Sequence, residues 1–308
     1  MSRDEMIARN DELVVIGIGE VLWDILPQGM HLGGAPANFA YYAHAHGARS
    51  YVVSAVGEDE LGRRAIERLS ELSIPVDYIS RHPDFPTGTV SVELSGDGQP
   101  EYRIHERVAW DHIPYLRSLS VITKEADAVC FGTLAQRSVD SRTAIQNILN
   151  AVPERACKVF DVNLRGSFYN PEIIEYSLNI ANVLKLNEQE LPVISGMFGL
   201  SGDEPALLDQ LQKRYNLNVI VLTKGECGSL IMSDGHMSVH RGIKTKVADT
   251  IGAGDAFTSS LVMGLLYGYS LDDLHECASR VAAFVCSNSG ATTPLPCDLR
   301  MTPRIMRY

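Results

Sequence analysis

The feature that most constrains the fold is a regular alternation of short apolar runs with longer amphipathic segments. The apolar runs are rich in β-branched residues and lie at 13–18, 50–56, 128–131, 158–162, 183–186 and 219–222. Segments of helical length lie between them, such as 61–72, 138–151 and 205–215. Continuous apolar runs of this kind are typical of parallel strands buried on both faces. We therefore predict right-handed βαβ units in a doubly wound α/β sheet, with ligands at the carboxyl ends of the strands.

One region departs from this alternation. Residues 88–94 and 100–105 each alternate apolar and polar side chains around the turn 95–98, which contains two glycines. That pattern predicts a β-hairpin. With residues 24–32 it could form a small separate sheet. An edge hairpin without a role is the simpler alternative, but the mixture of Arg103, His105, Trp110 and Asp111 favours a face that meets a ligand.

A glycine-rich turn carries the strongest chemical signal. Residues 249–255 read DTIGAGD, and the apolar segment 256–266 follows at once, which predicts a helix whose first turn contains Asp255. The free N–H groups and the dipole of such a helix end favour a phosphate oxygen. Asp255 could simply cap the helix. Gly252 and Gly254 favour a ligand instead. Glycine loses more backbone entropy on folding than other residues, so two glycines are a poor choice here unless a ligand must approach the backbone closely.

A similar turn occurs near the start of the chain. Gly33 and Gly34 precede the segment Ala35-Pro36-Ala37-Asn38, which has helical character. The Asn38 amide can both donate to and accept from hydroxyl groups. The alternative is an ordinary glycine turn in which Asn38 belongs to the start of a helix.

Composition and motif absences exclude several classes of protein. The formal net charge of −11, from 27 Lys plus Arg and 38 Asp plus Glu, disfavours nucleic-acid and membrane partners. The six cysteines form no C-x-x-C pair, which predicts reduced core thiols, and the run 13–18 is too short for a leader or a membrane span. We therefore expect a cytoplasmic protein of one domain, 1–308. A P-loop is absent, and the Gly17-x-Gly19 pattern lacks the third glycine of a dinucleotide site, where Leu22 stands.

The two glycine turns, in this order and at opposite ends of the chain, resemble the signatures of ribokinase-like (PfkB) carbohydrate kinases. The resemblance implies a three-layer α/β/α fold with a small β lid formed by residues 24–32 and 87–113. It also implies that sugar hydroxyls are bound by side chains and bare backbone of the N-terminal half, namely Asp24, Gly33, Gly34, Asn38 and Arg103. Asp255 would be the catalytic base, with Gly252, Ala253 and Gly254 forming the anion hole.

Three further motifs extend the resemblance. Arg165 ends a D-x-N-x-R pattern after the run 158–162 and would neutralise charge on the transferred phosphoryl group, although a surface ion pair is the alternative. Asn187 and Glu190 match an N-x-x-E pattern that would hold Mg²⁺ through waters, or they merely start a helix. Thr223, Gly225 and Gly228 match a nucleotide turn, for which an ordinary hairpin is the alternative.

The C-terminal loop and the substrate are implied less directly. Asn288 would border the nucleotide, and backbone carbonyls could coordinate K⁺ from Asp249, Ile251, Val285, Asn288 and Gly290. The resemblance implies ATP as the phosphoryl donor and is strongest for fructokinases. Residues 105–108, HERV, depart from their usual lid sequence, so ribokinase and 2-keto-3-deoxygluconate kinase stay open, as does a regulator that binds without turnover. Pairing of lids would give a homodimer.

Overall fold

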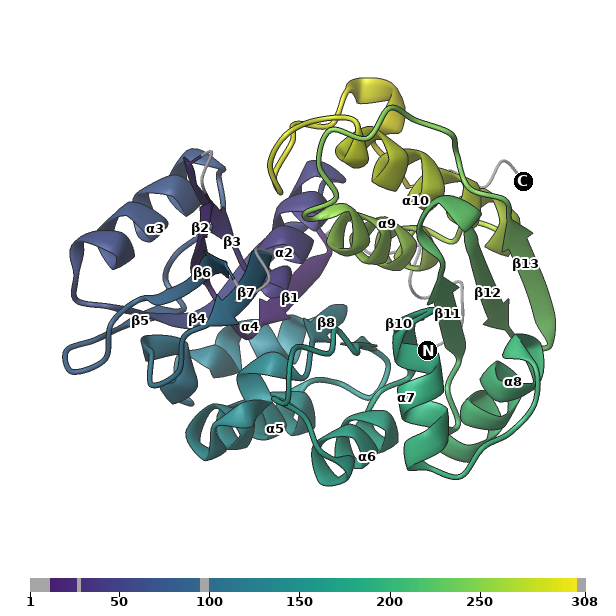
Figure 1. Ribbon diagram of the computed structural model, residues 1–308, viewed down its shortest axis with the longest axis horizontal. Coiled ribbons are helices and arrows are strands. Elements are labelled where there is room, and N and C mark those ends of the chain that lie inside the picture. The colour runs from purple at the N-terminus through teal and green to yellow at the C-terminus, as the bar shows by residue number, and fades with distance from the viewer. Residues whose placement is uncertain (1–11, 27–28, 95–99, 304–308) are drawn as a thin grey trace.

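The computed structural model describes residues 12–26, 29–94 and 100–303, and its framework is a sheet of nine strands. The strand order is β13-β12-β11-β10-β9-β8-β1-β4-β5 (Figure 1). The strand bounds are β1 Val14–Ile18, β4 Arg49–Gly57, β5 Ile79–His82, β8 Ala128–Phe131, β9 Cys157–Asp161, β10 Val183–Asn187, β11 Val219–Thr223, β12 Ser229–Ser233 and β13 His236–His240.

The sheet is parallel from β11 to β5, and β12 and β13 continue it as an antiparallel edge. All six strands expected from apolar runs are present. The sequence pattern did not predict β5 or β13, because each is short and carries polar side chains. Strand order reverses between β1 and β8: the chain runs outward from β1 through β4 to β5, then resumes at β8 on the other side of β1. Such a switch point is where open α/β sheets bind ligands.

Helices cover both faces of this sheet, giving three layers. Their bounds are α2 Ala35–Ala45, α3 Glu60–Glu71, α4 Leu119–Glu125, α5 Val139–Ala151, α6 Pro171–Ile180, α7 Glu190–Met197, α8 Glu204–Tyr215, α9 Ala253–Leu266 and α10 Leu271–Cys286. Adjacent residues of β1 show why both faces are apolar: Ile16 packs in the core with α4 to α8, whereas Val15 packs in the core with α2, α9 and α10. The predicted doubly wound fold is therefore confirmed.

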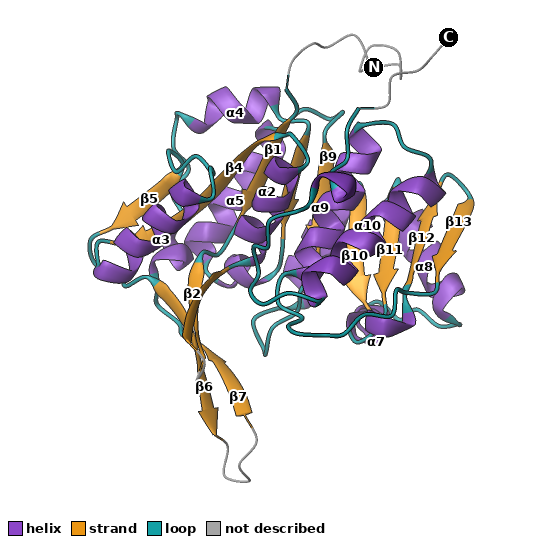
Figure 2. Cartoon of the chain, turned by 90° about the horizontal axis from the view of Figure 1, so that it is seen from above, coloured by secondary structure: helices purple, strands orange, loops and turns teal. Residues whose placement is uncertain are grey.

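A second, smaller sheet has the order β3-β2-β6-β7, with β2 Leu22–Leu26, β3 Gly29–Gly33, β6 Gly88–Leu94 and β7 Pro100–Ile104. The predicted hairpin is β6 and β7, which pair antiparallel, and its turn at 95–98 lies outside the described residues. Figure 2 shows these strands extending away from the body of the molecule.

The predicted lid boundary at residue 113 extends too far. Residues Ala109–His112 form a short 3₁₀ helix, and Trp110 is fully buried in the core beneath the large sheet. A buried indole contributes about 150–250 Å² of apolar contact, which explains why this segment joins the core instead of the small sheet. Trp110 therefore does not face a ligand.

The six cysteines differ in their exposure to solvent. All six cysteines are free, but only Cys130 is fully buried, and Cys227 and Cys297 are exposed, so not all are the core thiols that the sequence predicted. Within the described residues, no helix combines the length and apolar character needed to span a membrane.

Candidate active site

The two glycine signatures meet in the folded chain. Asn38 lies in the first turns of α2 and Asp255 in the first turn of α9, and the two helices pack together. Asn38 Nδ2 donates a hydrogen bond of 2.8 Å to Asp255 Oδ2. Residues 217 positions apart in the sequence thus share one contact, at the N-terminal ends of two helices.

Both helices begin at a glycine, and the reason for each glycine is steric. Gly34 (φ 116°) and Gly252 (φ 79°) are N-caps in conformations that side chains rarely adopt. A Cβ atom would lie 2.3 Å from the backbone oxygen of Glu20 at Gly34, and 2.6 Å from that of Ala291 at Gly252. Close approach of protein backbone therefore accounts for both. Neither glycine N-cap offers a side chain, so other groups must satisfy the first N–H groups of these helices.

A small cavity at the carboxyl ends of β1, β8 and β9 contains three carboxylates. Glu20, Asp161 and Asp255 line it, together with Gly132 and Asn163. Burial raises the pKa of Asp255 to about 6, and the charge of Asp161 adds to this, whereas the hydrogen bond from Asn38 and the charges of Lys185 and Arg165 oppose it. A carboxyl group with a pKa this close to neutrality is suited to accept a proton.

Glu20 was not predicted as a site residue. It follows β1 directly and is 4% exposed, and burial raises its pKa to about 7, with the nearby charge of Asp255 adding to the increase. The available sequence signal was its position immediately after the first buried strand, which it shares with Asp24. Two acids with raised pKa values therefore lie together at the switch point.

Asp24 and Arg165 do not line this cavity, but their charges act on each other, and the charge of Arg165 acts on the acids that do line it. Asp24 is on β2 of the small sheet, and burial raises its pKa to about 6, against the charges of His31 and Arg165. A Cβ at Gly33 would lie 2.5 Å from the Asp24 carboxylate, so Gly33 leaves room for that group. Arg165 is exposed, and its charge acts on Asp24, Glu20 and Asp255. The structure thus brings these predicted residues together.

A buried ion pair lies behind the cavity and was also missed from the sequence. Lys185 Nζ on β10 contacts Asp161 Oδ1 at 3.0 Å, and Asp161 Oδ2 accepts a hydrogen bond of 2.9 Å from Thr258 Oγ1 of α9. Burial lowers the pKa of Lys185, but the charge of Asp161 outweighs this and holds the pKa of Lys185 above its ordinary value. The signal was a lysine inside the apolar run 183–186.

Asn187 and Glu190 form a brace at the end of β10. Asn187 Oδ1 accepts from the backbone N–H groups of Gln189 and Glu190, at 2.9 and 3.0 Å. The buried Glu190 carboxylate accepts from the N–H groups of Asn187 and Leu164, each at 2.8 Å. Asn187 and Glu190 thus stabilise the start of α7, as the alternative interpretation of this motif predicts. This arrangement leaves further oxygen lone pairs, since a carboxylate offers about four acceptor positions.

The predicted nucleotide turn joins β11 to the antiparallel β12 through the 3₁₀ turn Gly225–Cys227, so the hairpin interpretation is also correct. Its glycines differ in purpose. Gly225 has φ 51°, and a Cβ at that position would have no atom within 4 Å, whereas a Cβ at Gly228 would lie 1.9 Å from the His240 carbonyl oxygen. Gly228 is therefore required by chain packing, and only Gly225 leaves open space for a ligand.

The C-terminal loop is tied to the turn before α9. Asp249 Oδ1 accepts from Ile251 N at 3.0 Å, and Asp249 Oδ2 accepts from Gly290 N at 3.1 Å. Asn288 follows α10, and its Nδ2 donates to the Phe284 carbonyl at 2.7 Å. The carbonyl of Val285 accepts from Asn288 N at 3.0 Å. The segments predicted to hold K⁺ therefore converge. Within the described residues, no group of three or more His, Cys, Asp or Glu could hold a metal.

The predicted ligand face of the lid is only partly assembled. His105 contacts Ser91 Oγ at 3.0 Å, while Asp111 is buried in an ion pair with Arg137 at 2.8 Å. Arg103 lies on β7 and is exposed. Asp111 thus neutralises a protein cation.

Comparison with known proteins agrees with this geometry. A family model described as pfkB family carbohydrate kinase matches residues 25–298. The fructokinase of Escherichia coli is 28% identical over 297 residues, covering 91% of this chain and 95% of that protein. The ATP-dependent 6-phosphofructokinase of Thermoanaerobacterium thermosaccharolyticum is 27% identical over 317 residues, covering 95% and 94%.

A solved structure shows the same fold. The fructokinase of Xylella fastidiosa with bound ATP superposes with a TM-score of 0.79 at 21% identity, covering 92% of this chain and 95% of that one. The family model matches most of the chain, and the solved structure shares its fold. This chain therefore belongs to the pfkB family of carbohydrate kinases and is an ATP-dependent sugar kinase.

Proposed function

We propose that the protein transfers the γ-phosphoryl group of ATP to a hydroxymethyl group of fructose, with Asp255 as the general base. The observation that carries this proposal is the 2.8 Å hydrogen bond from Asn38 to Asp255 at the cavity. It fixes one carboxylate oxygen and leaves the other to accept the proton of the attacking hydroxyl. Asp24, Gly33, Gly34, Asn38 and Arg103 bind the remaining sugar oxygens.

Charge on the transferred group is stabilised by the chain itself. The first turn of α9 begins at Gly252, and the helix dipole favours an anion there, although Ala253 N already donates to the Thr250 carbonyl at 3.3 Å. Arg165, exposed in the loop between β9 and α6, supplies a guanidinium fork for phosphoryl oxygens. Positioning and electrostatics supply most of the rate in such transfers.

We assign Thr223, Gly225, Gly228 and Asn288 to the nucleotide site, where Gly228 would act by shaping the turn. The oxygens of Asn187 and Glu190 fit Mg²⁺, which prefers hard oxygen donors and keeps several waters. When bound, Mg²⁺ would neutralise the phosphate charge. The carbonyls of Asp249, Ile251, Val285, Asn288 and Gly290 fit K⁺, because the Asp249 bridge brings these segments together.

The choice of fructose rests on the similarity to fructokinases. A coupled assay of ADP release over fructose, ribose and 2-keto-3-deoxygluconate tests it, and fructose should give the highest kcat/KM. A preference for ribose or 2-keto-3-deoxygluconate would identify the protein as a ribokinase or a 2-keto-3-deoxygluconate kinase instead. A flat response to every sugar would favour a regulator that binds without turnover, which the intact Asp255 and Arg165 argue against.

We further propose one kinase domain, 1–308, in the cytoplasm, and a homodimer formed through the small sheet. Ile25 on β2 is 42% exposed and offers apolar surface to a partner. A sheet this small gains stability by packing against a partner.

A further inference from the structure

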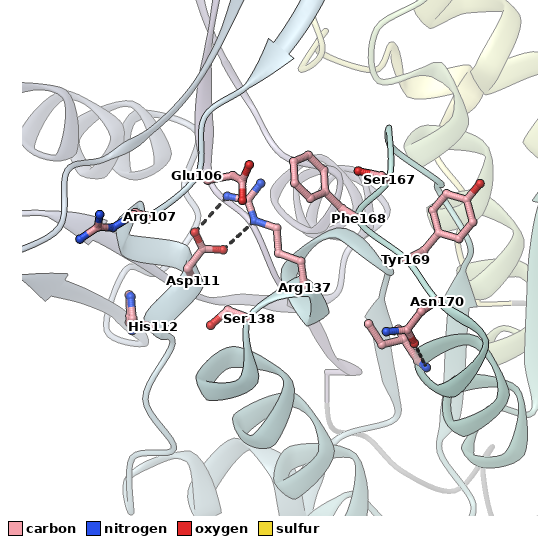
Figure 3. Close-up of a pocket in the computed structure, with 11 residues that line it drawn as sticks. Glu106, Arg107, Asp111, His112, Arg137, Ser138, Ser167, Phe168, Tyr169 and Asn170 are labelled. Carbon is pink, nitrogen blue, oxygen red and sulfur yellow. Dashed lines mark hydrogen bonds and ion pairs between the residues drawn. The ribbon is translucent and has the colours of Figure 1, made fainter.

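A second, larger pocket lies beside the catalytic cavity and has no part in the proposed transfer. It has a volume of about 350 Å³ and is lined by three segments: 106–112 at the base of the small sheet, 137–138 before α5, and 167–173 after β9 (Figure 3). We call it the Arg137 pocket. Its volume is at the lower end of the range for small-molecule sites, about 300–1,000 Å³, which suits one sugar-sized unit.

The chain connects this pocket directly to the catalytic cavity. Gly132 and Asn163 line the cavity, and a few residues further along the same two segments, Arg137 and Phe168 line the pocket. Phe168 N donates a hydrogen bond of 3.0 Å to the Arg165 carbonyl, so one tight turn carries the proposed catalytic guanidinium at one end and a wall of the pocket at the other. A ligand that spans both sites would cross this turn.

Arg137 is the anchor of the pocket, and its side chain is only 7% exposed. Its Nε and Nη2 donate to the two Asp111 oxygens at 2.8 and 3.0 Å, and Nη2 also donates to the His105 carbonyl at 2.7 Å. The guanidinium carbon lies 3.9 Å from the centre of the Trp110 ring and 4.6 Å from that of Phe168. The group is therefore held rigidly.

One nitrogen of Arg137 is left over. Nη1 is buried and has no hydrogen-bond partner among the described residues. Figure 3 shows the Asp111 contacts on one side of the guanidinium and Phe168 on the other side. An unpaired buried donor destabilises the protein, and a ligand oxygen that reached Nη1 would relieve that cost. The pocket thus offers a donor that a ligand could satisfy.

The charges around the pocket select the class of ligand. Asp111 neutralises Arg137, and the exposed Arg107 is adjacent in sequence to the exposed Glu106, so the lining favours neither anions nor cations. Ser138, Ser167 and Asn170 supply neutral polar groups, and Phe168 and Tyr169 supply aromatic surface. Alternating donors and acceptors with aromatic walls suit a neutral ring that carries many hydroxyls.

We propose that the Arg137 pocket is an outer subsite for such a hydroxyl-rich ring. The ring is either the distal part of a substrate larger than a monosaccharide or a second sugar bound separately. The proposal rests on the proposed sugar-kinase site next to it. It gives a physical role to residues 105–108, the segment in which the sequence departs from the usual fructokinase lid, because Glu106 and Arg107 line the pocket.

The test uses two lining variants and a matched control. Tyr169→Ala removes an aromatic wall, and Glu106→Gln removes a charge and replaces one acceptor oxygen with an amide donor. Neither residue belongs to the transfer site. Tyr115→Ala is the control, because Tyr115 is 45% exposed and lines neither pocket. ADP release is measured with fructose, ribose, sucrose, maltose and trehalose. Saturation-transfer NMR measures binding of the same sugars to the full chain, independently of turnover.

If the distal part of the substrate occupies the pocket, a disaccharide is phosphorylated with the higher kcat/KM. Tyr169→Ala then raises its KM about tenfold, equivalent to about 1.4 kcal/mol, without changing kcat or the KM for ATP. If a separate sugar binds, only monosaccharides are phosphorylated, and Tyr169→Ala reduces the saturation transfer to a monosaccharide without changing its KM for phosphorylation. The control leaves both measurements unchanged.

Equal saturation transfer from every sugar to the wild type, to both lining variants and to the control would overturn the subsite. So would a KM increase that is the same for monosaccharides and disaccharides, because that pattern indicates a general disturbance of the catalytic site. A wild type that phosphorylates no sugar would refute the proposed function alone, since NMR binding would still decide whether the pocket holds a ring.

Discussion

The catalytic cavity and the Arg137 pocket are built on the same two segments but treat charge in opposite ways. In the cavity, Glu20 and Asp255 lie together with raised pKa values, because each is desolvated and lies close to another acidic group. In the pocket, Arg137 and Asp111 are equally well buried, at 7% and 8% exposure, but they neutralise each other through paired hydrogen bonds.

This difference separates a reactive site from a rigid one. A carboxyl group whose pKa lies close to neutral pH can both accept and release a proton, which favours acid–base chemistry. A fully paired buried ion pair instead fixes geometry, and removing one partner leaves an uncompensated charge. Substitution of Asp255 should therefore act mainly on turnover, and substitution of Arg137 mainly on stability.

The largest expected effect is on the base. Asp255→Asn retains the size of the side chain but removes its ability to accept a proton, so kcat should fall about 10²–10⁴-fold. ATP binding, measured by calorimetry, should persist. Turnover close to that of the wild type would show that Asp255 only caps α9.

The pocket should respond in stability. Arg137→Met leaves the Asp111 carboxylate buried without its partner, and we expect the free energy of unfolding to fall by about 3–5 kcal/mol, measured by urea denaturation. Arg165→Met is the matched control: the exposed Arg165 should affect turnover far more than stability. Equal stability of the two variants would show that the Arg137–Asp111 ion pair does not stabilise the fold more than the exposed Arg165 does.

Sugar binding should depend on the small sheet and on α2. Asp24→Ala and Asn38→Ala each leave sugar hydroxyls unpaired, which should raise the KM for the sugar about tenfold and leave the KM for ATP nearly unchanged. The two constants are measured in the same coupled assay. A parallel rise in both would indicate that these residues only support the fold.

The raised pKa of Glu20 also predicts a pH dependence of stability. Its folded pKa of about 7 exceeds the ordinary 4.5, so its contribution to stability is fully present below about pH 4.5 and is lost as pH rises through about 7. Glu20→Gln should therefore gain roughly 1–3 kcal/mol relative to the wild type between these pH values. Urea midpoints at about pH 4.5, 6 and 7.5 measure this, and the exposed Glu188→Gln controls for loss of charge. A constant difference across the three pH values would count against the buried carboxylate.

The smallest effect concerns assembly. Ile25→Asp places a charge on the exposed face of the small sheet and should convert a homodimer into a monomer in light scattering at micromolar concentration. Val90 is a poorer choice because it is only 7% exposed and its substitution would disturb the sheet itself. A monomeric wild type would remove the proposed interface.

The framework of the fold follows from local patterns in the sequence, and the same patterns supplied the residues that we propose for the site. Each of the six apolar runs corresponds to a parallel strand of the large sheet, because a strand buried on both faces must be apolar throughout. The turns at 33–38 and 249–255 predicted two glycine-led helices, because few residues other than glycine adopt the required positive φ. These are local properties, which a chain expresses in its own order.

Tertiary structure alone decided which residues meet and which charges are paired. The contact of Asn38 with Asp255, the partnership of Lys185 with Asp161 and the burial of Trp110 all join distant positions. Gly228 could not be recognised as a packing glycine until His240 was placed against it. Burial and pairing depend on the neighbours that folding supplies, and a sequence pattern records the side chain but not its surroundings.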